Sequence, residues 1–251
     1  MSSSIWTQCA GTFEPRALRL EPWRVVEAQH RTSTRKLVST DAEQRVLEEL
    51  IEGVKPPDPT GGRLHYLLAT PFRYPPLAHG SRFGGRRERG IWYGSETLGA
   101  AFAEVAYYRF LFLEGTAAVL DGVETQLTAF RATLHAARAA DLTAGCFAAH
   151  RGAVASPTSY GATQALGADL RGAGVDALRY PSARDPAGGV NVAVLDPTAF
   201  ARRRPHALET WHCTATPARV ELRKLDYFRQ RSFAFVRQQF LVKGRLPAPA
   251  L

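Results

Sequence analysis

The sequence predicts an α+β protein, because segments with helical periodicity and β-prone runs both occur along its 251 residues. Hydrophobic residues make up 45% of the chain and charged residues 22%, a balance typical of a globular protein with a sizeable core. This length allows one large domain or two small ones. No apolar run approaches the roughly 20 residues that a membrane-spanning helix needs, so we expect no membrane span.

Residues 1–62 are predicted to form an N-terminal extension or arm, and residues 63–251 the main domain. In the extension, Thr40 or Asp41 suits the N-cap of a helix, and apolar side chains follow at helical spacing as far as Val54. The sequence KPPDPTGG that follows is typical of a turn or a short linker. We therefore expect a helical extension.

The main domain is predicted to open with a buried strand at residues 64–68, whose sequence is LHYLL. Residues 72–90 are rich in Pro, Gly and Arg and are predicted to be a loop. A short β-prone run at 91–93 precedes a helix that is capped by Ser95 or Thr97 and extends to about residue 112. The apolar stripe expected on this helix consists of Ala101, Phe102, Val105, Tyr108 and Phe112.

A second helix is predicted at residues 163–173, because Gly174 is well placed to end it as a C′ glycine. Strands are expected on both sides of a glycine-rich loop, at 175–180 and 190–195. Two alternating runs near the C-terminus, at 220–223 and 232–236, are predicted to be edge strands.

The charge of the chain favours an anionic ligand or partner. The net charge is +9 at pH 7, and arginine greatly outnumbers lysine. Arginine matches the geometry of phosphate and carboxylate groups better than lysine does. A phosphate-bearing ligand, a nucleic acid and an acidic protein each fit this excess. A GC-rich genome, whose codons favour arginine, would give the same bulk excess.

The cysteines and histidines predict neither a disulfide framework nor a metal site. Cys9, Cys146 and Cys213 are scattered and odd in number, which fits a reducing cytosol. The seven histidines show no HExxH or other ligand spacing. The N-terminal residues lack the basic start and apolar core of a secretory signal, so we expect a cytoplasmic protein.

Two loop arginines, Arg73 and Arg82, are candidates for a pyrophosphate clamp. Converging guanidinium groups each form parallel charge-assisted hydrogen bonds with a diphosphate. The alternative is a pair of solvated arginines. Glu104 is placed by helical spacing at the boundary between core and solvent, where a carboxylate can stabilise positive charge that develops on a sugar. The alternative for Glu104 is a surface ion pair with a neighbouring arginine.

Three further side chains suit ligand binding. The ring of Tyr93, at the end of a short strand, can stack on a flat ligand ring, although a core tyrosine is the commoner outcome. Ser182 and Asn191 lie at junctions between loop and strand, where a hydroxyl and an amide can bind a ligand or serve ordinary turns.

Taken together, these segments resemble the RES domain family, which is named after an Arg, a Glu and a Ser. The resemblance covers about residues 64–197. The segments that carry it are Phe72-Arg-Tyr, Gly80-Ser-Arg-Phe83, Ile91-Trp-Tyr93, Ala101-Phe-Ala-Glu-Val105, Tyr160-Gly-Ala-Thr-Gln-Ala-Leu166, Tyr180-Pro-Ser-Ala183 and Gly189-Val-Asn191. Arg82 lies eleven residues before Tyr93, which lies eleven before Glu104.

The resemblance implies an ADP-ribosyltransferase-like RES fold, with small mixed or antiparallel sheets, flanking helices and the N-terminal helical extension. It implies catalytic roles for Glu104, Arg82 and Ser182. The residues implied to bind NAD are Arg73, Tyr74, Arg82, Tyr93, Gln164 and Asn191. Many members have Trp-Asn after the second arginine, whereas Phe83-Gly84 follows here, so the contact of the missing Asn is in doubt.

RES proteins are known as toxins of bacterial toxin–antitoxin pairs, and they consume NAD as a substrate without a prosthetic group. The resemblance implies cleavage of the nicotinamide–ribose bond, with water, phosphate or a protein side chain as the acceptor. It also implies an antitoxin, acidic or groove-filling and often with an Xre-like DNA-binding region, that blocks the cleft. Nucleic acid would then be contacted only through the antitoxin. The alternative is a basic nucleic-acid-binding or protein-interaction module without catalysis, for which Arg202-Arg203-Arg204 is the motivating feature.

Overall fold

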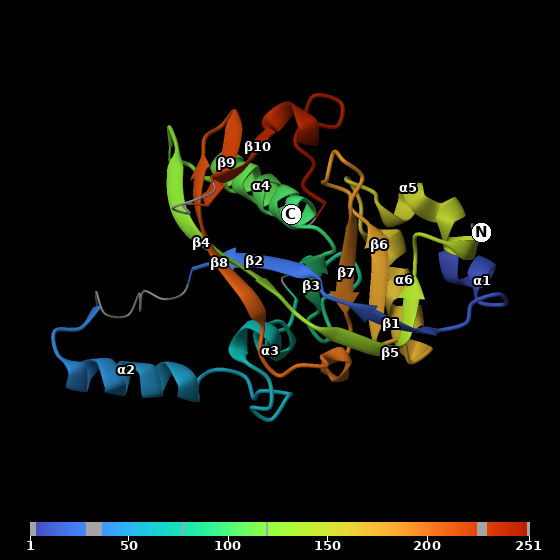
Figure 1. The fold of residues 1–251 in the computed structure, drawn as a ribbon, viewed down its shortest axis with the longest axis horizontal. Coiled ribbons are helices and arrows are strands. Elements are labelled where there is room, and N and C mark those ends of the chain that lie inside the picture. The colour runs from blue at the N-terminus through green and yellow to red at the C-terminus, as the bar shows by residue number, and fades with distance from the viewer. Residues whose placement is uncertain (1–3, 29–36, 77, 119, 225–229, 250–251) are drawn as a thin grey trace.

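The structure is a computed structural model that describes residues 4–28, 37–76, 78–118, 120–224 and 230–249 (Figure 1). It has the α+β class expected from the sequence. Leu77 of the predicted 72–90 loop and residues 29–36 of the predicted extension lie outside the described residues.

The strands of the described residues form one ten-stranded sheet, in the order β1-β5-β6-β7-β3-β2-β4-β8-β9-β10. This single sheet stands in place of the small sheets that we expected. Of its neighbouring strands only β5 and β6 run parallel; the other pairs are antiparallel. The strands are β1 (Arg16–Leu20), β2 (Trp23–Glu27), β3 (Trp92–Ser95), β4 (Val123–Arg131), β5 (Leu134–Asp141), β6 (Ala177–Pro181), β7 (Val190–Val194), β8 (His206–Ala215), β9 (Arg219–Lys224) and β10 (Arg231–Val236).

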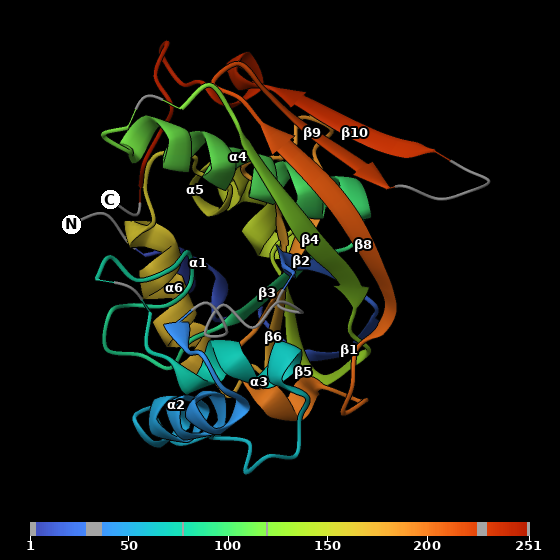
Figure 2. The same cartoon turned by 90° about the vertical axis from the view of Figure 1, so that its left-hand side faces the viewer.

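The helices cover different parts of this sheet. Figures 1 and 2 both show α4 at one end of the molecule, beside β9 and β10, and α2 and α3 at the other end. No helix of the described residues combines the length and the apolar character that crossing a membrane requires. The helices are α1 (Ile5–Cys9), α2 (Asp41–Gly53), α3 (Tyr66–Arg73), α4 (Leu98–Gly115), α5 (Arg151–Val154) and α6 (Gly161–Gly172), with 3₁₀ turns η2 (Gly145–His150), η3 (Pro197–Ala199) and η4 (Arg237–Phe240).

Helix α4 anchors the largest hydrophobic cluster. Phe102 and Phe110 are buried, and the ring of Phe102 packs edge-on against Trp211 of β8 at a centroid distance of 4.7 Å. Burial of each such ring stabilises the fold by roughly 1.5–3 kcal/mol. The apolar stripe that we expected was partly wrong, because Tyr108 and Phe112 are 54% and 52% exposed. The helix is apolar on nearly every side, so its sequence pattern does not single out the buried face.

The strand predicted at residues 64–68 is wrong, because this segment leads into α3. His65 caps the helix, and its Nδ1 accepts a hydrogen bond from the backbone N–H of Leu67 at 3.3 Å. Leu68 and Phe72, four residues apart, are both buried on one helical face. A short apolar run has the same appearance in a buried strand and in a buried helix.

The N-terminal region contributes both to the sheet and to an outlying helix. β1 pairs with β5, and β2 pairs with both β3 and β4, so residues 16–27 belong to the sheet and not to an arm. The capped helix is confirmed as α2, with a capping box between Thr40 and Glu43. No residue of α2 is buried, and Figure 1 shows this helix projecting from the rest of the molecule.

The later elements follow the sequence predictions closely. Thr97, one of the two expected caps, accepts a hydrogen bond from Ala100 N at the start of α4. Helix α6 ends as expected before Gly174, whose φ of +73° is a left-handed conformation that favours glycine. β6, β7, β9 and β10 lie within two residues of the predicted strands. β10 is an edge strand as predicted, whereas β9 is not, because it pairs with both β8 and β10.

The cysteine prediction is corrected by a disulfide between Cys9 and Cys146. The two residues are 137 apart in the sequence, and they meet because α1 packs beside η2. A separation of this size leaves no local spacing that sequence inspection can recognise. Cys213 is buried and has no disulfide.

Candidate active site

The candidate site is built around the carboxylate of Glu104 in the middle of α4. Ser182, just after β6, donates its hydroxyl hydrogen to Oε1 of Glu104 at 2.8 Å. Asn191 of β7 donates from Nδ2 to the same oxygen at 2.6 Å. Three residues that the sequence analysis selected separately are therefore brought into direct contact.

The donors to Glu104 are themselves held in place. Ser182 Oγ accepts hydrogen bonds from the backbone N–H groups of Arg184 and Asp185 at 3.1 and 3.0 Å. Ser95 donates to Oδ1 of Asn191 at 2.7 Å, because these residues face each other in the β3–β7 register. This bond turns the amide nitrogen of Asn191 toward the carboxylate.

The second carboxylate oxygen of Glu104, Oε2, accepts no hydrogen bond from the described residues. Glu104 itself is half-buried. A fixed carboxylate with one oxygen left open is suited to electrostatic contact with a ligand, because its orientation is set before the ligand arrives.

Arg82 is a buried cation, 8% exposed, without an acidic partner among the described residues. Its NH1 donates to the backbone oxygens of Val154 and Ser156, both at 3.0 Å. Its guanidinium carbon lies 4.7 Å from the centroid of the Tyr160 ring, at the start of α6. Neutral groups alone therefore hold this charge.

Arg82 and Glu104 act on the same buried tyrosines, so they share one electrostatic environment. Burial raises the pKa of Tyr180 well above its ordinary value, Glu104 adds to the rise and Arg82 opposes it. Burial likewise raises the pKa of Tyr107 to about 12, with Arg184 and Arg82 opposing and Glu104 adding to the rise.

Tyr93 and Gln164 fix the turn that carries Arg82. The hydroxyl of Tyr93 shares a hydrogen bond with Ser81 Oγ at 2.9 Å and accepts one from Phe83 N at 3.2 Å. Burial raises the pKa of Tyr93 to about 12, so the hydroxyl stays protonated. Gln164 Nε2 donates to the backbone oxygens of His79 and Ser81. Their polar ends are thus used within the protein; stacking of a ligand on Tyr93 stays a prediction.

Arg73 and Tyr74 are not brought into contact with this group. Arg73 ends α3, where its NH1 pairs with Glu52 of α2 at 2.8 Å and its Nε donates to the backbone oxygen of Pro56. Tyr74 is the C-cap residue of the same helix, and its side chain is exposed. The clamp that we expected between Arg73 and Arg82 is not formed in this structure.

Arg184 is a residue that the sequence analysis missed. It is 4% exposed, its guanidinium carbon lies 3.6 Å from the centroid of the Tyr107 ring, and its NH2 donates to the backbone oxygen of Pro157 at 3.0 Å. Its position two residues after Ser182 was the available signal. That signal is weak, because arginine is abundant throughout the chain.

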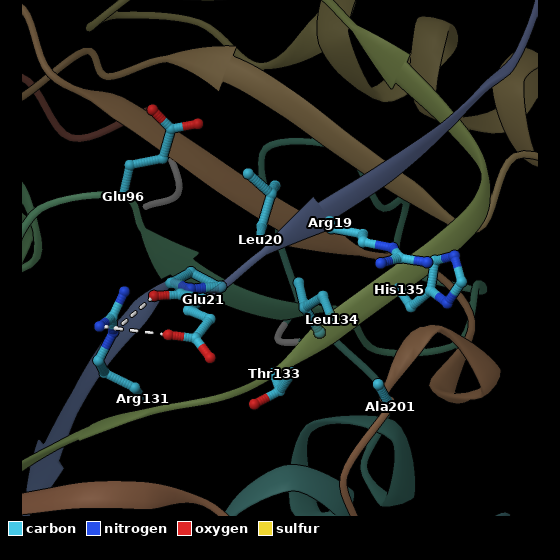
Figure 3. A pocket seen from close by; sticks show the side chains of 10 residues that line it. Arg19, Leu20, Glu21, Glu96, Arg131, Thr133, Leu134, His135 and Ala201 are labelled. Carbon is cyan, nitrogen blue, oxygen red and sulfur yellow. Dashed lines mark hydrogen bonds and ion pairs between the residues drawn. The ribbon is translucent and has the colours of Figure 1, made fainter.

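One cavity, of about 720 Å³, is lined by none of the candidate site residues (Figure 3). Its charged groups are largely matched: Arg131 pairs with Glu21, and Glu96 pairs with Arg179 at 2.5 Å. The lining residues are Arg19, Leu20, Glu21, Pro22, Glu96, Arg131, Thr133, Leu134, His135 and Ala201. Because most of its charges are paired and no candidate residue lines it, we do not assign the site to this cavity.

A second cavity, of about 660 Å³, is lined by Thr158 and by residues near the C-terminus. Pro247, which lines it, accepts a hydrogen bond from the hydroxyl of Tyr107 at 2.5 Å. Thr158, on the other wall, follows the proline that holds Arg184. The charged lining residues are the cations Lys243 and Arg245.

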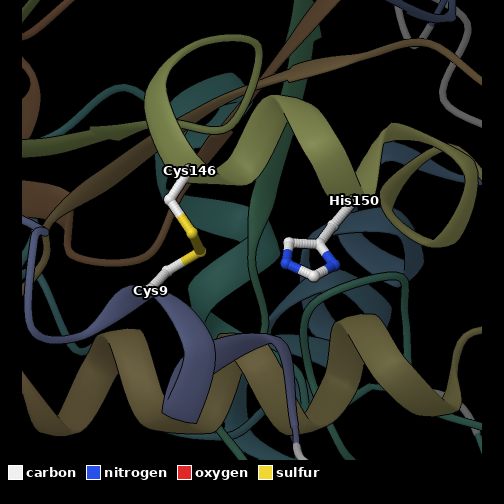
Figure 4. Close-up of side chains that lie close together, drawn as sticks. All are labelled: Cys9, Cys146 and His150. Atoms are coloured by element: carbon white, nitrogen blue, oxygen red, sulfur yellow. A yellow bond between two sulfur atoms is a disulfide. The ribbon is translucent and has the colours of Figure 1, made fainter.

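A possible metal-binding group within the described residues is Cys9, Cys146 and His150 (Figure 4). Their ligand atoms lie within 4.8 Å of one another. The two sulfur atoms are joined in the disulfide, and only a thiolate sulfur is an effective ligand. This group is therefore part of the covalent framework in the structure as it stands.

Comparison with known proteins gives a family for the chain. No curated protein matches it. A chain of the crystal structure of the M. tuberculosis MbcT–MbcA toxin–antitoxin complex is similar in structure, with 14% sequence identity, a TM-score of 0.44, and coverage of 86% of this chain and 94% of that one. The family model of the RES domain matches residues 59–216, which is more than half of the chain and includes Arg82, Glu104, Ser182 and Asn191. The chain therefore belongs to the RES domain family.

Proposed function

We propose that this protein is an NAD-consuming toxin that cleaves the bond between nicotinamide and ribose. The observation that carries the proposal is the fixed carboxylate of Glu104, whose Oε1 accepts from both Ser182 and Asn191 while Oε2 is left open. Membership of the RES family supports the same assignment.

The chemistry needs a negative group beside the ribose. As the C1′–N bond breaks, nicotinamide leaves with the bonding electron pair as a neutral molecule, and positive charge develops on the ribose. The carboxylate of Glu104 stabilises this charge. An acceptor oxygen then forms the new bond to C1′; when the acceptor is water, its proton is released to solvent.

No strong general acid is required, because the leaving group departs from a cationic bond and becomes neutral. The residues of the site therefore position groups and stabilise charge. Ser182 and Asn191 orient the carboxylate, and Ser95 orients Asn191. Such preorganised electrostatic contacts are worth about 10²–10³ in rate for a single group.

The acceptor and the biological setting belong to the proposal. Water, phosphate or a side chain of a protein target would each complete the reaction. We propose that a cognate antitoxin neutralises the protein by covering the site. Co-purification of the product of a neighbouring gene, with loss of toxicity when the two are expressed together, would support this role.

The direct test is incubation of the purified protein with NAD. We expect release of free nicotinamide, followed by chromatography, in buffer, with added phosphate or with cell extract. ADP-ribose, its 1-phosphate or a labelled protein would identify the acceptor. An NAD pool that is unchanged under all three conditions contradicts the proposed activity.

A second candidate function is polyanion binding without catalysis. Arg202, Arg203 and Arg204 are exposed and have no acidic partner within the described residues, which favours this alternative. Binding of DNA or RNA that weakens steeply with salt, together with an inert response to NAD, would support it.

A further inference from the structure

Three side chains with metal-ligating atoms, those of Cys9, Cys146 and His150, meet between α1 and η2 (Figure 4). Their ligand atoms all lie within 4.8 Å of one another. None of the residues assigned to the candidate active site belongs to this group. What these three residues can do is therefore a separate question from NAD cleavage.

One helical turn and one long-range contact bring the three side chains together. Cys146 and His150 both belong to η2, little more than one turn apart, and Figure 4 shows both side chains pointing from η2 toward α1. Cys9 is the last residue of α1, which packs against η2 and against α6. The fold thus presents three potential ligands from two elements to one point.

The imidazole of His150 is available to a ligand. Its ring nitrogens make no hydrogen bond and no ion pair with the residues that the structure describes. His150 and Cys146 are half-buried, whereas Cys9 is fully buried. A group placed between these side chains would therefore be held on one side by the protein and remain open to water on the other.

The ligand properties of the group depend on the redox state of the two cysteines. In the structure their sulfur atoms share a disulfide bond, and a disulfide sulfur is a poor ligand. Reducing compartments keep cysteine pairs as thiols, which lose their protons when they bind a metal ion. Two thiolates and one imidazole are donors that Zn²⁺ prefers, and a site with three protein ligands takes water as the fourth.

The distances permit such a site after small movements. Zinc lies about 2.3 Å from sulfur and about 2.0–2.1 Å from nitrogen, so the ligand atoms of a tetrahedral site are roughly 3.5–3.8 Å apart. The three ligand atoms already lie within 4.8 Å of one another. Once the bond between the sulfur atoms is cleaved, side-chain rotations that move the ligand atoms by about 1–2 Å bring them to one ion.

We propose that the reduced protein binds one zinc ion through Cys9, Cys146 and His150, and that oxidation of the two cysteines to the disulfide releases it. The inference goes beyond NAD cleavage and does not depend on it. The metal ion and the disulfide are alternative links between the same two elements, α1 and η2.

Both directions of the exchange balance in atoms and electrons. A phosphine reductant takes the oxygen of one water molecule, becomes a phosphine oxide and leaves two thiols in place of the disulfide. Zinc then bonds to both sulfur atoms and to a nitrogen of His150, and the two thiol protons pass to solvent. In the reverse direction, a small-molecule disulfide accepts two electrons and breaks into two thiolates, while the disulfide of the protein forms and Zn²⁺ leaves.

The test is titration of the full-length protein with cobalt(II) and then zinc, without oxygen, in a reduced and an oxidised preparation. The reductant is a phosphine, because dithiols bind zinc themselves. We expect the reduced wild type to take up one cobalt ion per chain, with the absorption of a tetrahedral thiolate complex, and zinc to displace it. The oxidised protein should take up neither ion.

Variants identify the ligands. His150→Ala should weaken zinc binding at least about a hundredfold, because even residues that merely support a ligand contribute about 10–100-fold to metal affinity. His135→Ala is the matched control, since His135 is an exposed histidine of β5 outside the group. Cys9→Ser should abolish the thiolate absorption of the wild-type complex, whereas Cys213→Ser should bind like the wild type.

Stability gives a second measurement. Zinc should raise the melting temperature of the reduced wild type and leave that of the oxidised protein unchanged, because a ligand stabilises the state that binds it. Melting curves also identify a variant that fails to fold. If Cys9→Ser fails to fold, His150→Ala decides the question, because the ring of His150 has no hydrogen bond to lose among the described residues.

Three results would each overturn the inference. The first is a reduced wild type that takes up no metal ion, and the second is an oxidised protein that binds zinc as tightly as the reduced one does. The third is a folded His150→Ala that keeps the wild-type affinity. Loss of binding in a folded Cys213→Ser would show a different set of ligands and would equally reject the site. None of these measurements involves NAD, so the inference and the proposed function can fail independently.

Discussion

The two ends of the molecule differ in whether their charged side chains form ion pairs. At the α2–α3 end, Arg73 is matched by Glu52 across two helices. At the α4 end, Arg82 and Arg184 are buried against carbonyl oxygens and rings, and Glu104 accepts only neutral donors. Charges that are compensated within the protein stabilise its fold, whereas charges left without a counterpart mark where a ligand supplies one.

The same contrast separates the two cavities. The larger one contains both acidic and basic groups, of which Glu21, Arg131 and Glu96 are in ion pairs, while the charged lining of the smaller one is entirely cationic. Volume alone would have selected the larger cavity. The charge balance favours the smaller cavity for an anionic ligand.

Glu104→Gln should have the largest effect. This change keeps the shape of the side chain and removes the charge, so we expect NAD cleavage to fall about 10²–10³-fold while the circular dichroism spectrum is unchanged. Glu52→Gln, at the α2–α3 end, is the matched control and should leave the rate within about twofold. Full activity in Glu104→Gln would mean that the carboxylate of Glu104 is not needed for NAD cleavage.

Reduction of the Cys9–Cys146 disulfide should destabilise the region around η2 and α5 and leave α2 unaffected. Closing a loop of this separation restricts the unfolded chain, so we expect reduction or Cys146→Ser to cost about 2–4 kcal/mol in the free energy of unfolding. Denaturant titration with and without a dithiol measures it. Hydrogen exchange should increase in η2 and α5 but not in α2; an equal increase in both regions would contradict the regional assignment.

Asn191→Ala should reduce the rate of cleavage by about tenfold to hundredfold, because Glu104 loses one of its two orienting donors. Ser95→Ala acts on Glu104 only through Asn191, so its effect should be smaller. In Asn191→Ala, the further change Ser95→Ala should cost nothing more in the rate. Additive losses in a double-mutant cycle would show that Ser95 has a separate role.

Arg73→Ala removes the ion pair with Glu52, which is the charge pairing that distinguishes the α2–α3 end from the α4 end. Because its partner Glu52 is exposed, we expect little change in stability and a KM for NAD within about twofold of the wild type. Arg82→Gln should raise that KM far more. Equal increases in KM for the two variants would support the sequence-based prediction that Arg73 and Arg82 clamp the substrate together.

The smallest effect should come from Glu209, a compensated carboxylate in β8. Burial would raise its pKa, but hydrogen bonds from Arg231, Lys224 and Trp211 outweigh this and lower the pKa below its ordinary value. The folded state therefore gains stability that is present above the unfolded pKa of about 4.3 and is lost as the pH falls through the lower folded pKa. Glu209→Gln should cost less than about 1 kcal/mol at pH 7, and acid denaturation curves should show this difference shrink as the pH falls through the folded pKa.

Local patterns in the sequence determined much of the fold. Two candidate caps each predicted the starts of α2 and α4, of which Thr40 and Thr97 cap the helices, and Gly174 predicted the end of α6. Caps can be recognised in the sequence because they act within a few residues of the helix end. Long-range strand pairing gave no comparable signal. β1 and β2 join the sheet, and the 64–68 run became the start of α3, for reasons that depend on packing partners distant in the sequence.

The same division holds for the site. The sequence by itself identified Glu104, Ser182 and Asn191 as candidates and, through its match to the family, determined what kind of protein this is. Only the tertiary structure decided that all three meet at one oxygen atom, that Arg73 is bound by α2, and that Arg184 is buried over the ring of Tyr107. The physical reason is that residue types and spacing fix local conformation and available chemistry, whereas the pairing of charges depends on which distant segments fold against one another.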